Sequence, residues 1–370
     1  MMVGMGDVHE TPGGLNRYFG ELRGALRQAG HSVQSVVAAG SDDQQLAGAQ
    51  RDPGEFFVSA GGSLLTRAGR VRREVLRRLD ADAVLNVHFA PYAAPLLFSG
   101  RRAQRTVVTF HGPWALEAQV EGAAGATVAM KRIVERLAYR RECHYVTLSD
   151  AFATVLAESF GVQRESIYVI RPGVDLERFH PGASAQLTVP TVFCVRRLRR
   201  RMGLEQLLDA WRIVADELPE ARLVIAGKGP LEAVLRTQIV ALGLDDSVRL
   251  AGFLDDGQLV EHFQSAHLTV VPTVALEGFG LVVLESLACG VAPIVTNIAG
   301  LPEVPAELCG ELIVAADDPR ALATRLLEGL TGARWLPDRG QCRSFAERFT
   351  WAAAAESYAH LFTSVREGAQ

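Results

Sequence analysis

Two glutamates on either side of a glycine-rich turn are the residues of this sequence best suited to bind a ligand. Glu277 and Glu285 lie eight positions apart, and the segment Gly278-Phe279-Gly280-Leu281 between them leads into an apolar run. Carboxylates accept hydrogen bonds from hydroxyl groups, and the unbonded amides at the start of a helix bind phosphate. The combination therefore favours a ligand that carries both groups, such as a sugar nucleotide.

The apolar run at 281–288 is predicted to form a helix, with Glu285 about one turn from its start. A carboxylate among apolar neighbours needs a partner. The ribose diol of a nucleotide is a functional candidate, and an arginine ion pair is the structural alternative. Glu277 precedes the helix, where a negative charge complements the helix dipole. Each glutamate alone suits a structural role as well as a functional one, but the pair together with Gly278 and Gly280 favours function.

A run of arginines follows a predicted strand. Five of the six residues at 196–201 are arginines, with Leu198 the exception. Guanidinium groups bind diphosphate well because each offers a planar fork of donors. We expect most of these side chains to be solvated, in particular Arg196, Arg199 and Arg200, and one or two of the others to reach a ligand. No aromatic residues interleave with the run, which disfavours a nucleic-acid surface.

His111 lies where the predicted strand 107–110 ends, and Gly112 and Pro113 follow it. The carboxyl end of a parallel strand faces the crevice in which ligands of such sheets bind. A neutral imidazole there can hydrogen-bond a sugar hydroxyl or stabilise a cationic reacting carbon. The structural alternative is a histidine whose hydrogen bonds are satisfied by the adjoining turn. His88 ends another predicted strand and is a weaker candidate of the same kind.

Two glycine-containing turns complete the set of candidates. Gly13 and Gly14 precede a helical pattern, and a turn without side chains lets a phosphate or a sugar approach the backbone amides. An ordinary turn explains this pair equally well. Gly227 and Gly229 follow the predicted strand 222–226. For this second pair we favour a purely structural explanation, a tight turn between strand and helix.

Short β-rich runs alternate with helical patterns along the chain, which is typical of parallel sheets covered by helices on both faces. Several runs are continuously apolar, as expected of strands buried on both sides. The predicted fold class is therefore α/β with doubly wound sheets. The strands are predicted at 84–88, 107–110, 145–148, 167–170, 191–195, 222–226, 268–271 and 293–296, and the helices at 15–29, 130–141, 204–217, 230–242 and 256–266.

A chain of 370 residues is long for one domain and suits two. The segment 171–175 (Arg-Pro-Gly-Val-Asp) ends a strand and the small polar residues at 181–186 resemble a linker, so a junction is predicted near 172–188. We predict one Rossmann-like domain at 1–175 and a second at 176–350. The ligand is expected in a cleft between two such domains, because the carboxyl ends of both sheets can face it.

The composition argues against several classes of protein. A formal net charge of -4 provides no basic field for nucleic acid. No apolar run approaches the roughly 20 residues of a membrane span. The five cysteines include no CxxC pair, which disfavours zinc and fits a reducing cytosol. Asp42-Asp43 and Asp255-Asp256 are predicted loop pairs unsuited to hold a metal. We predict a cytoplasmic protein that needs no metal or other cofactor.

One basic helical stretch offers a further partner. An anionic membrane that holds a lipid-linked acceptor would attract it, which would place the protein at the inner face of the membrane. A solvated helix face is the favoured alternative, because Glu74 and Asp80 interrupt the positive charge. The basic residues of this stretch are Arg67, Arg70, Arg72, Arg73, Arg77 and Arg78.

Taken in order along the chain, these motifs resemble those of the retaining glycosyltransferases of family 4, which have the GT-B fold of two Rossmann-like domains. The resemblance runs over nearly the whole chain. The Glu-x7-Glu signature alone is moderately specific, whereas the ordered series is highly specific. The series comprises Gly13-Gly14 in an N-terminal glycine loop, His111-Gly112, the interdomain Gly173-Val174-Asp175, Arg197-Leu198, Gly227 with Gly229, the signature from Glu277 to Glu285, and Phe349-Thr350-Trp351 before a closing helix.

The resemblance implies a role for each donor-site residue. Glu277 and the turn Gly278-Phe279-Gly280-Leu281 would hold the hydroxyls and the diphosphate of a donor nucleotide sugar, and Glu285 would hold its ribose. Arg197 would neutralise the leaving diphosphate. His111 would contact the sugar near the reacting carbon.

The resemblance also implies a binding role for each domain. The domain at 176–350 would bind the nucleotide sugar, and Gly13 and Gly14 of the other domain would face the β-phosphate. The domain at 1–175 would bind the acceptor, near 7–16 and 114–121. The closing helix at 351–370 would pack back on that domain.

The sequence departs from the family pattern at two places. The family usually has a lysine five residues after the arginine of its phosphate-binding loop, and this sequence has Met202 there. Arg201 is adjacent and basic, so we expect it to take over the charge. The first strand, at 1–5, is short for a central strand, which favours a natural start upstream of Met1.

The activity implied is retaining transfer of a hexosyl unit from a UDP- or GDP-sugar to a hydroxyl of a glycan, a lipid-linked or a small natural-product acceptor. Arginines and helix amides, without a metal, would stabilise the negative charge that grows on the departing phosphate. Two alternatives stay open. A sugar-nucleotide epimerase of the same fold would act without an acceptor, and a non-catalytic sugar-nucleotide-binding protein would bind the donor without converting it.

Overall fold

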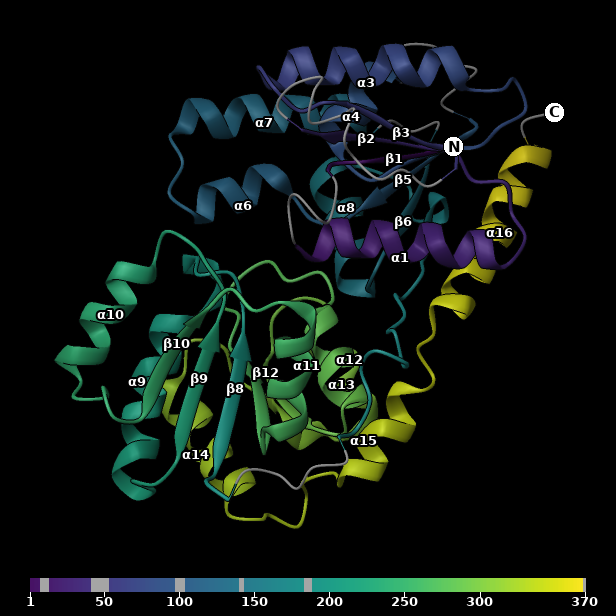
Figure 1. Cartoon of the computed structure of the whole chain (residues 1–370). Coiled ribbons are helices and arrows are strands. Elements are labelled where there is room, and N and C mark those ends of the chain that lie inside the picture. Colours follow the sequence, from purple (N-terminus) through teal and green to yellow (C-terminus); the bar gives the residue numbers. More distant parts are fainter. Residues whose placement is uncertain (7–12, 41–52, 97–103, 140–142, 183–187, 369–370) are drawn as a thin grey trace. The chain divides into compact units, whose positions relative to one another are not determined.

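The computed structural model describes residues 1–6, 13–40, 53–96, 104–139, 143–182 and 188–368. Contacts between Cα atoms divide the chain into two compact units, each built around its own sheet (Figure 1). The N-terminal unit comprises Met1–Gln119, Ala123–Gly173 and Trp351–Gln370, and the C-terminal unit comprises Val120–Gly122 and Val174–Thr350.

The N-terminal unit contains a parallel sheet of seven strands in the order β3-β2-β1-β4-β5-β6-β7. Helices cover it, so the strands at its centre are fully buried. The strand order changes direction between β1 and β4, and ligands of doubly wound sheets bind at such a switch point. The strands are β1 (Met2–Gly4), β2 (Ser35–Ala39), β3 (Glu55–Ser59), β4 (Leu85–Val87), β5 (Thr106–Phe110), β6 (His144–Thr147) and β7 (Ile167–Val169).

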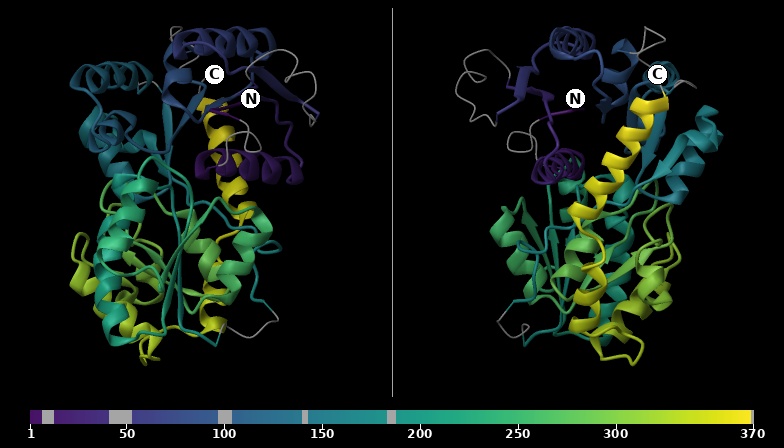
Figure 2. Two further views of the ribbon diagram at one scale, coloured as in Figure 1. Left: turned by 60° about the vertical axis from the view of Figure 1, so that its left-hand side comes forward. Right: turned by 90° about the vertical axis from the view of Figure 1, so that its right-hand side faces the viewer.

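The helices of this unit include the last one in the chain, which lies beside the first (Figure 2). Serine side chains cap two of them: Ser63 accepts from the Thr66 amide at 3.2 Å, and Ser149 from the Phe152 amide at 3.2 Å. The helices are α1 (Gly14–Gln28), α3 (Leu64–Arg78), α4 (Ala90–Leu96), α6 (Trp114–Val120), α7 (Gly125–Ala138), α8 (Asp150–Phe160), the short η1 (Arg164–Ser166) and α16 (Trp351–Gly368).

The C-terminal unit contains a parallel sheet of six strands in the order β10-β9-β8-β11-β12-β13, which changes direction between β8 and β11. The strands are β8 (Thr191–Val195), β9 (Arg222–Ala226), β10 (Val248–Gly252), β11 (Leu268–Val271), β12 (Ala292–Thr296) and β13 (Ile313–Val314). The helices are η2 (Arg200–Met202), α9 (Leu204–Glu217), α10 (Glu232–Ala241), α11 (Asp256–Ser265), α12 (Leu281–Ala288), α13 (Pro305–Leu308), η3 (Gly310–Leu312), α14 (Pro319–Leu330) and α15 (Arg339–Ala346).

The predicted α/β class with two doubly wound sheets is confirmed. The chain passes from one unit to the other at Gly173, inside the segment 171–175, while residues 183–187 of the expected linker lie outside the described part. Strands β2, β3, β10 and β13 were not predicted. β3 and β10 lie at sheet edges, where their partly exposed residues break the apolar pattern, and β13 has only two residues. β2 is fully buried inside the sheet, and its apolar run was missed. Helix α7 begins before its predicted start at 130, because its first three residues, 125–127, are exposed and add no apolar spacing.

Among the helices of the described ranges, none combines the length and the apolar character needed to cross a membrane.

Candidate active site

The predicted donor residues of the C-terminal unit lie where its sheet changes direction. Arg196 is the first residue after β8, and the loop to Gly280 follows β11, the neighbouring strand. The carboxyl ends of two adjacent parallel strands therefore bring the arginine run and the glutamate turn to one edge of the sheet. This is the edge at which open α/β sheets bind their ligands.

Arg196 is buried in this site, and the expectation that it is solvated is wrong. Its residue is 9% exposed, and its guanidinium forms an ion pair with Glu277 and donates to the hydroxyl of Thr273. The amide of Arg196 still bonds to the carbonyl of Ala226, at 2.9 Å, so the residue continues the line of the strand. Arg197, the next residue along the chain, is exposed.

Three arginines act on the Glu277 carboxylate. Burial alone would raise its pKa, but the positive charges of Arg196, Arg201 and Arg197 outweigh burial and hold the pKa of Glu277 below its ordinary value. The carboxylate is therefore ionised at neutral pH and surrounded by guanidinium groups. Such a cluster provides both hydrogen-bond acceptors for hydroxyls and positive charge for an anion.

Arg201 supports the loop that carries Glu277. It is buried, and its Nη1 donates to the carbonyl of Leu276 at 2.7 Å. Leu276 has a φ of 54°, which is a strained conformation for a residue other than glycine. The predicted charge role of Arg201 beside the buried Met202 stays a prediction, and the contact with Leu276 adds a structural role to it.

Gly227 and Gly229 hold the arginine segment in place. A Cβ atom on Gly227 would lie 1.9 Å from the carbonyl oxygen of Arg196, and one on Gly229 would lie 2.2 Å from that of Leu198. The amide of Leu198 also donates to the carbonyl of Lys228 at 3.1 Å. The turn is therefore a packing requirement of the arginine loop, which sharpens the purely structural explanation given above.

We expect Gly229→Ala to lower the free energy of unfolding by about 1–3 kcal/mol, because backbone must move to admit the methyl group. Urea unfolding of the full chain measures this. Gly310→Ala is the matched control, since a Cβ there meets no atom within 4 Å. An equal effect of the two substitutions would contradict the packing role.

Helix α12 has the predicted bounds and begins directly after the turn. Gly280 precedes it with a φ of 79°, and Glu285 inside it is 8% exposed. At the far end, Arg343 donates to the carbonyl of Ala288 at 3.2 Å. This cation complements the negative end of the helix dipole, while the positive end faces the turn. The ligand roles predicted for the turn and for Glu285 stay predictions.

In the N-terminal unit, two histidines follow neighbouring strands. His88 follows β4 and His111 follows β5, and β4 lies beside β1 at the switch point. Residues 7–12, which join β1 to Gly13 and Gly14, lie outside the described part, as does most of the acceptor region predicted at 7–16. Gly14 begins α1, with the exposed Gly13 as its cap residue.

A continuous set of buried polar side chains connects these histidines, and we call it the polar chain. His88 Nδ1 lies 3.1 Å from His111 Nε2, and His88 Nε2 lies 2.6 Å from Asn86 Oδ1. Asn86 Nδ2 lies 3.0 Å from Thr109 Oγ1, which is 3.1 Å from the hydroxyl of Tyr358. The polar chain comprises His111, His88, Asn86, Thr109, Tyr358 and Tyr18, whose hydroxyl is 3.0 Å from that of Tyr358.

The polar chain joins α16 to the site. Tyr358 belongs to α16 and is fully buried, and the Tyr18 ring from α1 packs edge-on against the ring of His111, with centroids 5.0 Å apart. Trp351, the first residue of α16, packs edge-on against the ring of Tyr18, with centroids 5.2 Å apart. Only His111 and, with less weight, His88 were singled out from the sequence. Asn86 gave a signal as the one polar residue of the short strand β4.

Burial lowers the pKa of His111 to about 4. The pKa of His88 lies well below its ordinary value, mainly because of burial and additionally because His111 is close. Both imidazoles are therefore neutral at physiological pH. A neutral imidazole has one donor nitrogen and one acceptor nitrogen. The polar chain must consequently assign these two roles to particular atoms.

The stability of wild type relative to His111→Asn is expected to change with pH. Between pH 4 and 6.5 the unfolded histidine binds a proton that the folded one rejects, so wild type loses stability on acidification. Above pH 6.5 the difference in the free energy of unfolding between wild type and His111→Asn is constant. By pH 4 this difference should have shifted against wild type by roughly 3 kcal/mol. Urea unfolding at a series of pH values measures this, and a difference independent of pH would contradict the buried neutral state.

Glu135 is a residue of this unit that the sequence analysis missed. It is fully buried on α7 and accepts hydrogen bonds from the amides of Trp114, at 2.7 Å, and Ala115, at 3.1 Å. These amides begin α6, which follows His111, so Glu135 anchors the chain just beyond that histidine. Burial raises its pKa to about 7 against the opposing effect of these hydrogen bonds.

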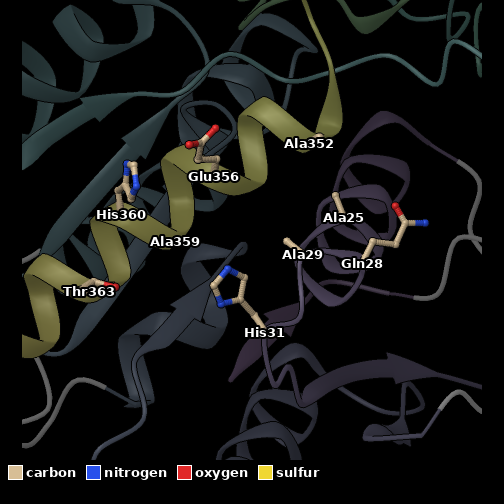
Figure 3. A pocket seen from close by; sticks show the side chains of 9 residues that line it. All are labelled: Ala25, Gln28, Ala29, His31, Ala352, Glu356, Ala359, His360 and Thr363. Carbon is tan, nitrogen blue, oxygen red and sulfur yellow. The ribbon is translucent and has the colours of Figure 1, made fainter.

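One cavity lies apart from all predicted site residues. It has a volume of about 550 Å³ and lies between α1 and α16 (Figure 3). Small side chains form much of its wall, so it is a gap between two helices. It is lined by Ala25, Gln28, Ala29, His31, Ala352, Glu356, Ala359, His360 and Thr363.

The basic stretch, for which a solvated helix face was favoured over membrane contact, forms α3, and other groups of the protein pair with some of its arginines. Arg70 donates to the carbonyl of Gly61 at 2.7 Å, Arg72 donates to that of Pro95 at 3.1 Å, and Arg77 and Arg78 pair with Glu74. Membrane contact stays a prediction.

Comparisons with known proteins match both units. A model described as "Glycosyltransferase Family 4" matches residues 12–178, and one described as "Glycosyl transferases group 1" matches residues 177–348. Glycogen synthase of Mycobacterium tuberculosis is 28% identical over 96% of this chain and 92% of its own length. D-inositol 3-phosphate glycosyltransferase 2 of Catenulispora acidiphila is 30% identical over 58% of this chain. That match spans 54% of the relative, so the chain covers about half the length of this and several other curated relatives.

Solved structures share the fold over the whole chain. Sucrose-phosphate synthase from Thermosynechococcus elongatus superposes with a TM-score of 0.81 at 21% identity and full coverage of both chains. Anabaena Alr3699/HepE in complex with UDP and glucose has a TM-score of 0.77 at 19% identity, with 98% of this chain and 100% of that chain covered. At 21% and 19% identity such a likeness is evidence for the fold alone, and it confirms the predicted two-domain GT-B fold.

Proposed function

Because this chain belongs to glycosyltransferase family 4, whose models match it from residue 12 to residue 348, we propose that it transfers a hexosyl unit from a UDP- or GDP-sugar to a hydroxyl acceptor, with retention at the anomeric carbon. The observation that carries the proposal is the convergence of Arg196, Arg197 and Arg201 on Glu277 at the start of α12. The acceptor is a glycan, a lipid-linked sugar or a small natural product.

The chemistry follows from the charges at this site. When the bond between the sugar and the phosphate breaks, negative charge grows on the departing oxygen. The exposed guanidinium of Arg197 and the first amides of α12 supply positive charge there. Glu277 stays ionised and accepts hydrogen bonds from sugar hydroxyls, while Glu285, inside α12, accepts from the ribose. These donors serve in place of a metal, so activity should persist in EDTA.

The structural neighbours support a nucleotide sugar as the donor. Anabaena HepE was solved with UDP and glucose, and UDP-glucose is therefore the first donor to try. The curated relatives are named for transfer to D-inositol 3-phosphate and for glycogen synthesis, which supports a sugar or polyol hydroxyl as acceptor.

A thermal-shift screen of UDP- and GDP-sugars against the full chain tests donor binding, because a ligand that binds only the folded state raises its melting temperature. We expect one nucleotide class to stand out and Glu285→Ala to reduce its shift. No shift with any nucleotide sugar would contradict the proposal. Incubation of the preferred donor without acceptor identifies an epimerase, which alone would convert it. A binding protein would also leave the donor unchanged when acceptors are added, whereas the proposed transferase would then consume it.

A further inference from the structure

The orientation of the Asn86 amide is fixed by a backbone carbonyl. Asn86 Nδ2 lies 3.2 Å from the carbonyl oxygen of Val107, which can only accept a hydrogen bond. The nitrogen and oxygen of this amide are thereby assigned by their partners, without reference to the histidine. Asn86 Oδ1, the remaining acceptor, points to His88 Nε2 at 2.6 Å.

This assignment determines the protonation of His88. Because Asn86 Oδ1 accepts, His88 Nε2 must carry the proton that it donates. His88 is 1% exposed and lies against a second histidine, so it is neutral, and a neutral imidazole that donates through Nε2 accepts through Nδ1. The acceptor of His88 faces His111 Nε2 at 3.1 Å.

His111 then has only one arrangement that forms a hydrogen bond. Its Nε2 carries the proton and donates to His88, so its Nδ1 holds the lone pair. Among the described residues, no group is hydrogen-bonded to His111 Nδ1, and the residue is partly exposed. The molecule thus presents one acceptor atom at the carboxyl end of β5, at the strand edge where a ligand of this sheet binds.

We propose that Asn86 and His88 are positioning residues that fix His111 as the Nε2–H tautomer, so that the sugar contact that the family resemblance implies for His111 is made through the lone pair of Nδ1. This rests on the proposed function for the identity of the ligand. The opposite tautomer would present an N–H group at the same place, and the hydroxyl could then bond His111 only as an acceptor. A lost hydrogen bond of ordinary strength corresponds to about tenfold in rate.

Two substitutions at His111 distinguish its nitrogens. The amide of asparagine reaches the position of Nδ1, whereas that of glutamine reaches the position of Nε2. With the nucleotide sugar that gives the largest thermal shift, we expect His111→Asn to retain about tenfold more kcat/KM than His111→Gln, with the nucleotide Kd unchanged in both. Equal activity, or higher activity of the glutamine variant, would overturn the acceptor role of Nδ1.

Nitrogen-15 NMR of the histidine-labelled full chain at pH 8 tests the tautomer without any ligand. The signals of His111 are those that are missing from the spectrum of His111→Asn. In wild type they should show the Nε2–H tautomer, and an Nδ1–H signal would overturn the inference. Asn86→Asp keeps an acceptor toward His88, so it should keep the Nε2–H tautomer. Asn86→Leu removes that acceptor and frees His88 to donate to His111. We therefore expect Asn86→Asp to retain more activity than Asn86→Leu. A purely structural role for Asn86 predicts the reverse order, because a buried carboxylate is the more costly group.

The two readouts separate the possible failures. If the tautomer is found but no nucleotide sugar binds or turns over, the proposed function fails and the ligand assigned to Nδ1 fails with it, while the positioning role of Asn86 and His88 stands. If transfer is observed but His111 carries its proton on Nδ1, the inference fails and the proposed function stands.

Discussion

Arg197→Ala is expected to lower kcat for sugar transfer by about 10²–10³-fold, because it removes one donor of positive charge to the departing phosphate. The side chain is exposed, so the free energy of unfolding should stay within about 0.5 kcal/mol of wild type. Steady-state release of the nucleoside diphosphate and urea unfolding measure the two quantities.

Arg200→Ala is the control for this experiment, since it removes an exposed arginine of the same run that is not itself a predicted site residue. It should leave kcat within a few-fold of wild type. Near-normal turnover of the Arg197 variant would contradict its role at the departing phosphate. An equal loss in both variants would show that the arginine run acts only through its general charge.

The second large effect is expected for stability. Arg196→Met should lower the free energy of unfolding by about 3 kcal/mol or more, because it leaves the largely buried Glu277 carboxylate without its closest partner. The pKa of Glu277, now held low by this charge, should rise, so the loss should be greater at pH 8 than at pH 4. Urea unfolding at the two pH values provides the measurement.

The double variant Arg196→Met with Glu277→Gln shows whether the pair itself is responsible. Removing both charges leaves no buried unpaired ion, so the double variant should be more stable than Arg196→Met alone. If the two single losses simply add, the residues do not stabilise each other, and the account of Glu277 as a carboxylate held by Arg196 is wrong.

The sequence was sufficient for much of the fold because most of its central strands are continuous apolar runs. Helices α9 and α12 and strands β8, β9 and β11 have the bounds that their patterns predict. In a doubly wound sheet, strand order then places the residues that follow β8 and β11 at one edge. The grouping of the arginine run with Glu277 could therefore be anticipated.

The distinction between Arg196 and Arg197 could not be anticipated, because neighbouring residues at a strand end point in opposite directions. The side chain that turns inward depends on where the strand stops pairing. Here the amide of Arg196 still bonds to Ala226, and its side chain is directed to Thr273 and Glu277. The number of arginines in the run favoured solvation of Arg196. Its contacts with the Glu277 carboxylate and the Thr273 hydroxyl offset the free-energy cost of removing its guanidinium from water.

The polar chain was beyond sequence analysis for a different reason. Tyr18 and Tyr358 are 340 positions apart and contact each other through α1 and α16, whose packing no local pattern specifies. The structure also shows that Asn86 supports His88, which was weighed as a lesser copy of His111. His88 lies between Asn86 and His111 in the polar chain, which gives it a positioning contact on each side.

If the proposed function is right, the site around Glu277 releases a nucleoside diphosphate when a sugar is transferred to an acceptor. The most direct measurement is NMR analysis of the products formed from a UDP- or GDP-sugar with and without candidate acceptor hydroxyls, in wild type and in Arg197→Ala. The account predicts an acceptor-dependent product with the anomeric configuration of the donor, formed by wild type and nearly lost in the variant. An inverted product, conversion of the donor without acceptor, or equal activity of the two proteins would contradict it.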